Sequence, residues 1–216
     1  MKTIKSSGQP TKHQIKTQAT LHALLEAAEK VFVRDGYERA QIETIAAEAG
    51  RTKGAIYAHF RSKEDIFFAL TERRMRSRRE ALLQSLQSLP FQRQIALIRE
   101  YFVTTFDDEN WHILMLEFKL LAMRNQASAR RMRELYDLLY EATHTFLSQA
   151  KGLTDVQKNK AMMGFAIMRG VPGAVILEKQ FYPALNSPDA KEILGEVFDS
   201  LIGHSNPGRG RKRKPA

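Results

Sequence analysis

Cysteine is absent from the 216 residues, and long apolar runs are nearly absent as well. Without cysteine the chain has no disulfide, no thiolate zinc ligand and no cysteine nucleophile. Residues 1–18 carry charge but no apolar segment, which excludes a secretory signal of the usual kind. The most apolar stretch, residues 161–177, is interrupted by Arg169, Gly170, Pro172 and Gly173 and is too short to span a membrane. We therefore expect a cytoplasmic protein without a membrane partner.

Motifs for enzymatic chemistry are also lacking. The sequence contains no HExxH zinc motif, no nucleophile elbow, no P-loop and no dinucleotide fingerprint. Its six histidines and the carboxylates near them do not form a set of metal ligands at helical spacing that supports a metal site. The sequence thus predicts that the protein is not an enzyme and binds neither metal nor cofactor.

The net charge of +10 is concentrated at the two ends. Residues 1–80 hold 16 Lys and Arg against 10 Asp and Glu, residues 81–207 hold 13 against 14, and residues 208–216 hold five against none. A near-neutral body with basic ends is typical of a protein whose ends meet a polyanion such as DNA. A surface that only maintains solubility has the same pattern, so charge alone leaves both interpretations open.

Helical periodicity runs through the chain, whereas strand signals are nearly absent. Apolar residues recur at three-and-four spacing, and Gly36, Gly50 and Pro90 mark helix ends. The predicted helices are residues 17–35, 42–49, 53–60, 62–89, 91–107, 110–125, 127–150, 155–181 and 188–202. Pro172 predicts a kink in the eighth of these. The predicted fold class is all-α.

Residues 42–60 have the spacing of a helix-turn-helix, because two short helices meet at a three-residue turn that begins with Gly50. On a helical wheel of about 100° per residue, Ile56 and Phe60 face the core of the domain. The outward face consists of Gly54, Ala55 and Ala58. Such a face would normally carry charge. Its lack of bulk lets the helix enter a major groove of DNA, where the Ala55 methyl can meet a thymine methyl.

Polar residues surround this small-residue face. Tyr57 and His59 flank it and are placed to reach the phosphates on either side of the groove. Thr52 and Lys53 lie at the start of the helix, where recognition helices usually meet base edges. Tyr57 as a packing residue and His59 as an incidental surface histidine remain the alternatives.

Residues 17–77 resemble the DNA-binding domain of the TetR family of transcriptional regulators. The matching residues are Ala27, Ala28, Phe32, Gly36, Tyr37, Ile45, Ala46, Ala49, Gly50, Lys53, Gly54, Ile56, Tyr57, His59, Phe60, Ser62, Lys63 and Glu64. The resemblance implies an N-terminal three-helix helix-turn-helix DNA-binding domain and a C-terminal helical-bundle domain for effector binding and dimerisation. The implied domains are a flexible basic arm at 1–16, the DNA-binding domain at 17–77, the ligand-binding and dimerisation domain at 78–203 and a flexible basic tail at 204–216.

The resemblance also implies which residues contact DNA, and three positions depart from the family pattern. Arg51 replaces a small apolar residue, Gln41 replaces the usual capping Thr or Ser, and Glu43 replaces a residue that is commonly basic. We interpret Arg51 as a base or phosphate contact, with a solvent-facing turn residue as the alternative. The predicted DNA-binding set is Gln41, Arg51, Thr52, Lys53, Gly54, Ala55, Tyr57, His59 and Lys63.

Basic residues outside the helix-turn-helix have two interpretations each. The run Arg73, Arg74, Arg76, Arg78 and Arg79 is interpreted as a solvated helix face, with direct DNA contact as the alternative. The arm before the first helix could enter a minor groove, and the tail Arg209–Lys214 could add non-specific DNA affinity. A solvated role is the alternative for both.

The C-terminal body is rich in aromatic residues and methionine on amphipathic helices, a composition that fits either a plain core or an apolar effector site. The predicted effector-pocket residues are Phe102, Phe106, Trp111, Met115, Phe118, Met123, Met162, Phe165 and Met168. His112, Glu117, Arg124 and Arg169 could orient a polar group of a ligand. Residues 164–173 and 188–202 could form a dimer interface or pack within one chain.

The predicted function is that of a homodimeric repressor that binds a pseudo-palindromic operator in double-stranded DNA and is released by a small-molecule effector. The alternatives are an architectural DNA-binding protein without an effector and an enzyme with a basic surface.

Overall fold

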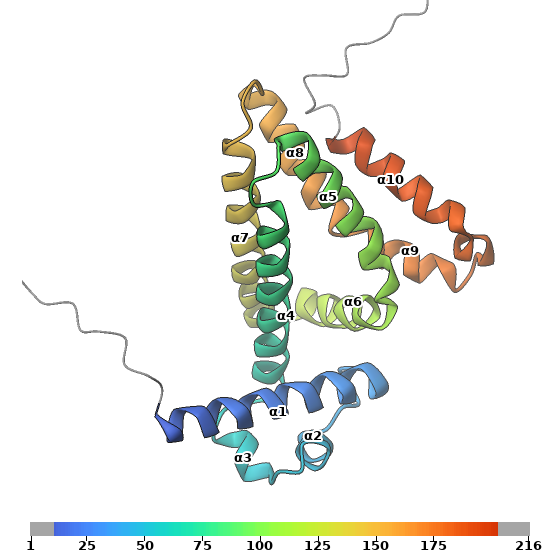
Figure 1. Cartoon of the computed structure of the whole chain (residues 1–216). Helices are drawn as coiled ribbons and strands as arrows, with labels where there is room; N and C mark the ends of the chain where they lie inside the picture. Colours follow the sequence, from blue (N-terminus) through green and yellow to red (C-terminus); the bar gives the residue numbers. More distant parts are fainter. Residues whose placement is uncertain (1–10, 203–216) are drawn as a thin grey trace, which may run out of the picture. The chain divides into compact units, whose positions relative to one another are not determined.

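The computed structural model describes residues 11–202, except for the side chains of His13, Gln14 and Phe106. Predictions for the first ten residues of the arm, for the tail at 204–216 and for the Phe106 side chain fall outside this description. The helices are α1 (Lys12–Asp35), α2 (Ile42–Glu48), α3 (Lys53–Tyr57), α4 (Lys63–Leu86), α5 (Phe91–Thr104), α6 (Glu109–Arg124), α7 (Gln126–Ser148), α8 (Asp155–Met168), α9 (Val171–Lys179) and α10 (Pro188–Ile202) (Figure 1). Two 3-10 turns, Thr105–Asp107 and Pro183–Asn186, complete the regular structure of residues 11–202. The all-α prediction is confirmed.

The chain divides into two compact units, which separate between Met75 and Arg76 inside α4. The boundary expected from sequence lies two residues further along the same helix. The predicted arm at 1–16 is wrong at its C-terminal end, because α1 already begins at Lys12. Lys and Gln residues of good helix propensity follow Pro10 there, and no breaker separates them from the apolar part of the helix.

The N-terminal unit is built around three aromatic side chains from α1, α4 and the α1–α2 loop. The Phe32 and Phe67 rings lie 5.8 Å apart edge to face, and the Tyr37 ring is 5.2 Å from Phe67 and 5.6 Å from Phe32. The spacing and tilt are those that aromatic pairs favour. Ile45 and Ile56, from α2 and α3, are completely buried in the same unit. Both helices of the turn motif are therefore anchored through their inner faces.

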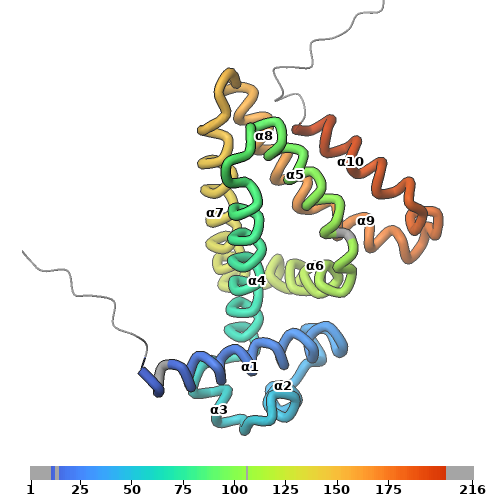
Figure 2. The backbone as a smooth tube through the Cα atoms, viewed as in Figure 1, coloured from blue at the N-terminus to red at the C-terminus, as the bar shows by residue number. Residues whose placement is uncertain are grey.

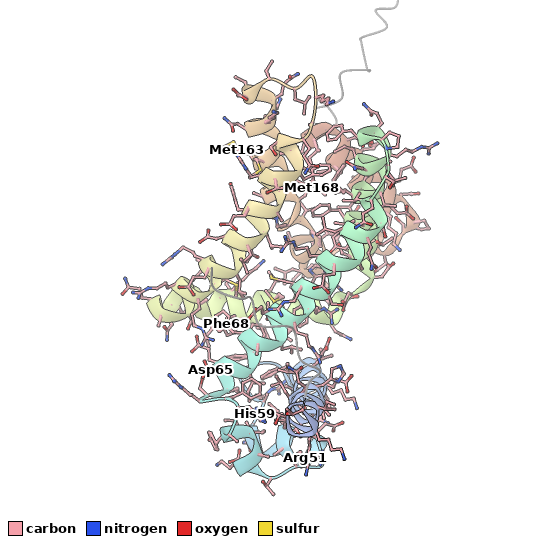
Figure 3. The ribbon with its side chains drawn as sticks, turned by 60° about the vertical axis from the view of Figure 1, so that its left-hand side comes forward. Arg51, His59, Asp65, Phe68, Met163 and Met168 are labelled. Carbon is pink, nitrogen blue, oxygen red and sulfur yellow. The ribbon has the colours of Figure 1, made fainter. Side chains whose placement is uncertain are left out.

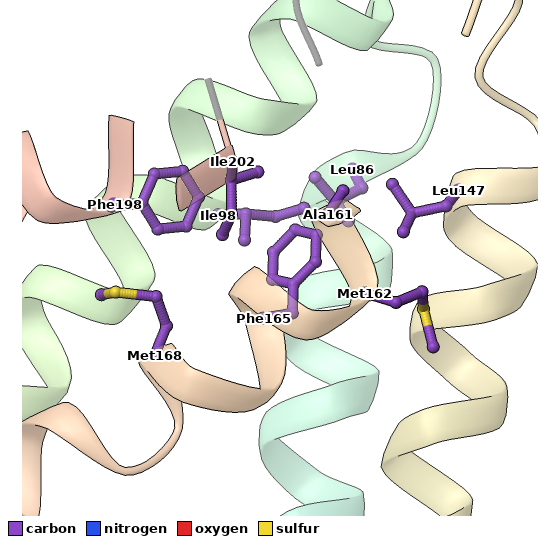
Figure 4. Packing of buried hydrophobic residues seen from close by; sticks show 9 residues of the cluster. All are labelled: Leu86, Ile98, Leu147, Ala161, Met162, Phe165, Met168, Phe198 and Ile202. Atoms are coloured by element: carbon purple, nitrogen blue, oxygen red, sulfur yellow. The ribbon is translucent and has the colours of Figure 1, made fainter. Parts of the chain in front are cut away.

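The core of the C-terminal unit joins five helices. It contains Leu86, Ile98, Leu147, Ala161, Met162, Phe165, Met168, Phe198 and Ile202, from α4, α5, α7, α8 and α10 (Figure 4). The apolar face of α10 is thus packed within its own chain, with Phe198 and Ile202 completely buried. For that face, the structure favours intramolecular packing over the dimer interface that the sequence also allowed.

The predicted helix at 155–181 is in fact two helices that run in different directions (Figure 2). Arg169 ends α8, Gly170 precedes α9, and Pro172 lies in the first turn of α9, where its missing N–H costs no hydrogen bond. By length and apolar composition alone the segment Asp155–Lys179 could span a membrane, but this is weak evidence because core helices pass the same test. Here Phe165, Met168 and Ile176 are buried in the unit.

A glycine allows α8 and α10 to approach each other closely. A Cβ atom placed on Gly164 would lie 2.9 Å from the carbonyl oxygen of Leu201 and 3.1 Å from the Ile202 side chain. Because the first neighbour is backbone, it cannot rotate away. Gly164 therefore fixes the separation of these two helices.

We expect Gly164→Ala to lower the free energy of unfolding of the C-terminal unit by about 1–2 kcal/mol, since overpacking outweighs the gain in helix propensity. Gly170→Ala is the matched control, because the nearest atom to its Cβ would be 3.4 Å away. Urea denaturation followed by fluorescence of Trp111, the single tryptophan, measures both variants. Equal stability of the two would contradict the tight α8–α10 contact.

Candidate nucleic-acid interface

The turn between α2 and α3 holds the two helices in helix-turn-helix geometry. Gly50 adopts φ 61°, a left-handed conformation that favours glycine, and leads the chain away from α2. The Thr52 hydroxyl caps α3 by accepting a hydrogen bond from the Ala55 N–H at 3.3 Å. The short helix α3 thus begins at a defined place, with Ile56 anchored inside the unit.

The small-residue face of α3 is open, as the wheel predicted. Gly54 and Ala58 are exposed, and Ala55 is partly exposed. A Cβ on Gly54 would meet only the Thr52 hydroxyl, at 3.7 Å. Packing inside the protein therefore does not explain the absence of bulk on this face.

Lys53 is held beside that face by two neighbours. Its ammonium forms an ion pair with Glu43 of α2 and lies 5.8 Å from the centre of the Tyr57 ring. The hydrogen bond with Glu43 raises the pKa of Lys53, and the same bond lowers the pKa of Glu43. The pair is solvent-exposed, so it contributes little to stability, but it gives the unusual carboxylate a role that sequence spacing did not reveal. Sequence reasoning noted only that Glu43 replaces a residue that is commonly basic, and it missed this partner.

Lys63 occupies a different environment from the one the sequence suggested. Its Nζ donates hydrogen bonds to the carbonyl oxygens of Tyr37 at 2.7 Å, Glu38 at 2.8 Å and Ala40 at 3.0 Å. It also lies 4.8 Å from the centre of the Tyr37 ring. Partial burial lowers the pKa of Lys63, and nearby Glu38 acts in the opposite direction.

An ammonium has three donors, and all three are used inside the N-terminal unit. This side chain therefore ties the α1–α2 loop to the start of α4, and its predicted phosphate contact remains a prediction. No sequence signal indicates this, because the acceptors are backbone atoms 23 to 26 residues away.

The other predicted contacts remain predictions. Tyr57 is 49% exposed, which agrees poorly with a packing role, and His59 is partly buried. Arg51 is exposed at the turn, where its guanidinium makes one long hydrogen bond of 3.4 Å to the Gly50 carbonyl (Figure 3). Gln41 precedes α2 without a side-chain capping bond and is also exposed. These side chains are available to a partner.

The arginine run along α4 is partly neutralised within each unit. Arg73 and Arg74 both pair with Glu29 of α1, and Arg78 pairs with Asp108. These ion pairs favour the interpretation in which the run is a structural and solvated face.

The predicted effector residues do not all lie in the interior. Trp111, Met115, Phe118, Met162, Phe165 and Met168 are buried, and Phe102 is partly buried against Phe165 and Phe198. Met123 does not lie among them, because it is 81% exposed near the end of α6, and its place in an effector pocket remains a prediction. Of the polar candidates, Glu117 and Arg124 are exposed, and the His112 ring is bound to the Thr105 carbonyl at 3.0 Å. Within residues 11–202 no group of three acidic or histidine side chains could hold a metal ion.

Comparison with known proteins identifies the N-terminal unit. Residues 24–70 match the model of the bacterial regulatory proteins of the tetR family. The repressor BepR of Brucella suis is 42% identical over 66 residues, which are 31% of this chain and 32% of BepR. The fatty acid metabolism regulator protein of Bacillus subtilis is 38% identical over 52 residues, 24% of this chain and 27% of that protein. The matched segments thus cover about a third or less of the length of these relatives.

Solved structures extend the similarity of fold to the whole chain. The fatty acid degradation regulator FadR from Bacillus halodurans has a TM-score of 0.67 at 18% identity and covers 96% of this chain and 100% of its own. FadR from Bacillus subtilis in complex with stearoyl-CoA has a TM-score of 0.65 at 21% identity, covering 84% of this chain and 97% of its own. The predicted architecture of a helix-turn-helix unit followed by a helical unit is confirmed. Residues 24–70 thus match the tetR family of bacterial regulatory proteins, and the chain as a whole shares the fold of solved transcriptional regulators.

Proposed function

We propose that the protein is a homodimeric transcriptional repressor of the cytoplasm, which binds operator DNA through α3. The observation that carries this proposal is the open face of Gly54 and Ala58 on a helix whose other side is anchored by Ile56. A helix whose exposed face carries almost no side-chain bulk can bring its backbone deep into a major groove. Lys53 and Tyr57 lie at its margins. The ammonium of Lys53 and the hydroxyl of Tyr57 can donate hydrogen bonds to the phosphate oxygens.

An exposed apolar face in the C-terminal unit supports the dimer. Val156, Met163 and Ile167 lie on one side of α8 and are 78%, 67% and 54% exposed. Leu177 of α9 and Phe181 just after it are exposed as well. Large apolar side chains that recur on one helix face are typical of protein interfaces. A symmetric dimer would present two recognition helices to half-sites about 34 Å apart, or a multiple of it, on a pseudo-palindrome.

We further propose that a small molecule bound in the C-terminal unit releases the repressor. The support is the cluster of buried aromatic and methionine side chains, which can repack around an apolar group. The complex of Bacillus subtilis FadR with stearoyl-CoA shows that a protein of the same fold binds such a ligand. The effector acts only through its difference in affinity for the DNA-binding and the released conformations.

Selection of bound fragments from random DNA tests the proposal, followed by titration of the winning duplex. Lys53→Ala combined with Tyr57→Ala is expected to weaken binding at least tenfold and to flatten its dependence on salt, because phosphate contacts are lost. Arg130→Ala, an exposed cation on α7, is the control and should leave affinity unchanged. Failure to enrich any sequence would contradict the repressor and favour an architectural DNA-binding protein.

A further inference from the structure

One half-buried cation in the C-terminal unit has no acidic partner. Arg169, at the end of α8, donates a hydrogen bond from Nη2 to the Thr143 hydroxyl at 3.3 Å, and its guanidinium lies 5.8 Å from the centre of the Tyr140 ring. Burial lowers the pKa of Arg169, because desolvation disfavours its charge. No carboxylate of the described residues forms an ion pair with it. A guanidinium has five N–H donors, so most of its binding capacity is unused.

A second cation lies on the same face of α7. The Lys119 ammonium of α6 is 5.6 Å from the centre of the Tyr136 ring, and it too has no ion pair within residues 11–202. Tyr136, Tyr140 and Thr143 are spaced four and three residues apart, so they line one side of α7. The helices α6 and α8 each pack against α7 and bring their cations to this side.

Three further partly buried cations of the C-terminal unit are each paired with a carboxylate. Arg99 binds Asp199 at 3.1 Å, Lys179 binds Glu109 at 3.8 Å, and Arg78 binds Asp108. Taking a charge out of water is costly unless an opposite charge compensates. In this unit such compensation is common, which makes its absence at Arg169 and Lys119 informative.

We propose that Arg169, Lys119 and the Tyr136–Tyr140–Thr143 side of α7 bind the anionic head group of the effector, a carboxylate or a phosphate. This inference rests on the proposed effector function and specifies its ligand class. A guanidinium matches both anions with paired hydrogen bonds, and the hydroxyl of Tyr140 supplies a further donor. The Thr143 hydroxyl donates to the Leu139 carbonyl at 2.8 Å and accepts from Arg169, so its part is to position the guanidinium. Met162, one of the buried core methionines, lies two turns before Arg169 on α8, so the apolar part of such a ligand would adjoin the core.

Three eight-carbon probes with different head groups test this assignment on the full-length protein: sodium octanoate, octyl phosphate and 1-octanol. Thermal unfolding followed by Trp111 fluorescence reports their binding, because a ligand of the folded state raises the midpoint. At least one anion is expected to bind tenfold or more tightly than the alcohol. The ranking of octanoate against octyl phosphate distinguishes carboxylate from phosphate.

Arg169→Gln is expected to bind the anionic probe no more tightly than 1-octanol, whereas Arg169→Lys keeps part of the difference in affinity. Arg124→Gln, an exposed cation on α6, is the control and should retain it fully. Without ligand, Arg169→Gln should unfold at the same or a higher temperature, because it removes an uncompensated charge. A purely structural arginine would instead lower that temperature and leave the anion preference in place.

Equal binding of all three probes to the unmodified protein would overturn the proposal, as would an anion advantage that survives Arg169→Gln. DNA does not enter these titrations. A negative result for the anion site therefore does not affect the proposal of operator binding. If operator binding is not found, the probe affinities can still be measured and interpreted.

Discussion

Lys63→Met is expected to lower the free energy of unfolding of the N-terminal unit by about 2–3 kcal/mol. The three carbonyl oxygens of Tyr37, Glu38 and Ala40 lose a charged donor at once. Hydrogen bonds to charged groups contribute about 1.5–3 kcal/mol each, and partial access of water to these carbonyls reduces the total. The methionine keeps most of the aliphatic chain, so lost packing contributes little.

Far-UV circular dichroism and tryptophan fluorescence separate the two units in this experiment. Trp111 lies in the C-terminal unit, so its fluorescence should be unchanged by Lys63→Met, while the helical signal of the N-terminal unit is lost at lower urea. Lys53→Met is the matched control: its ammonium is exposed and forms an ion pair with Glu43, so this substitution should shift the urea midpoint far less than Lys63→Met. Equal costs for the two variants would contradict the role of Lys63 in holding the α1–α2 loop to the start of α4.

The helices and the turn motif could be predicted from sequence because their signals are local. The spacing of Ile56 and Phe60 fixes the inner face of α3, and it leaves Gly54 and Ala58 outside by geometry alone. Gly50 marks the turn because few other residues adopt its backbone conformation. Such features depend on a few adjacent residues.

The features that the sequence did not reveal depend on contacts between distant residues. Nothing near Lys63 in the sequence indicates its three carbonyl acceptors, and nothing near Glu43 indicates Lys53 ten residues later. Met123 continues the apolar pattern of α6 but falls where that helix has no neighbour to cover it. Arg169 was one of several polar candidates, and only the tertiary structure shows that it differs from Arg99 in lacking a carboxylate.

Added bulk on the outward face of α3 should abolish DNA binding without affecting the fold. Gly54→Leu and Ala58→Leu both place a large side chain in open space, and the first also improves helix propensity by nearly 1 kcal/mol. In the groove the same side chain would hold the helix backbone away from the bases and break its phosphate contacts. We expect each variant to lose at least 100-fold in affinity, about 2.8 kcal/mol.

The most direct measurement is the dissociation constant of these variants for the duplex selected by the unmodified protein, taken together with their unfolding midpoints. Ala19→Leu, an equally exposed substitution on α1, is the control and should bind normally. If DNA meets this face of α3, Gly54→Leu and Ala58→Leu remain as stable as the unmodified protein and no longer bind the duplex. Tight binding by stable, folded Gly54→Leu and Ala58→Leu would contradict it, because DNA would then not approach this face of α3.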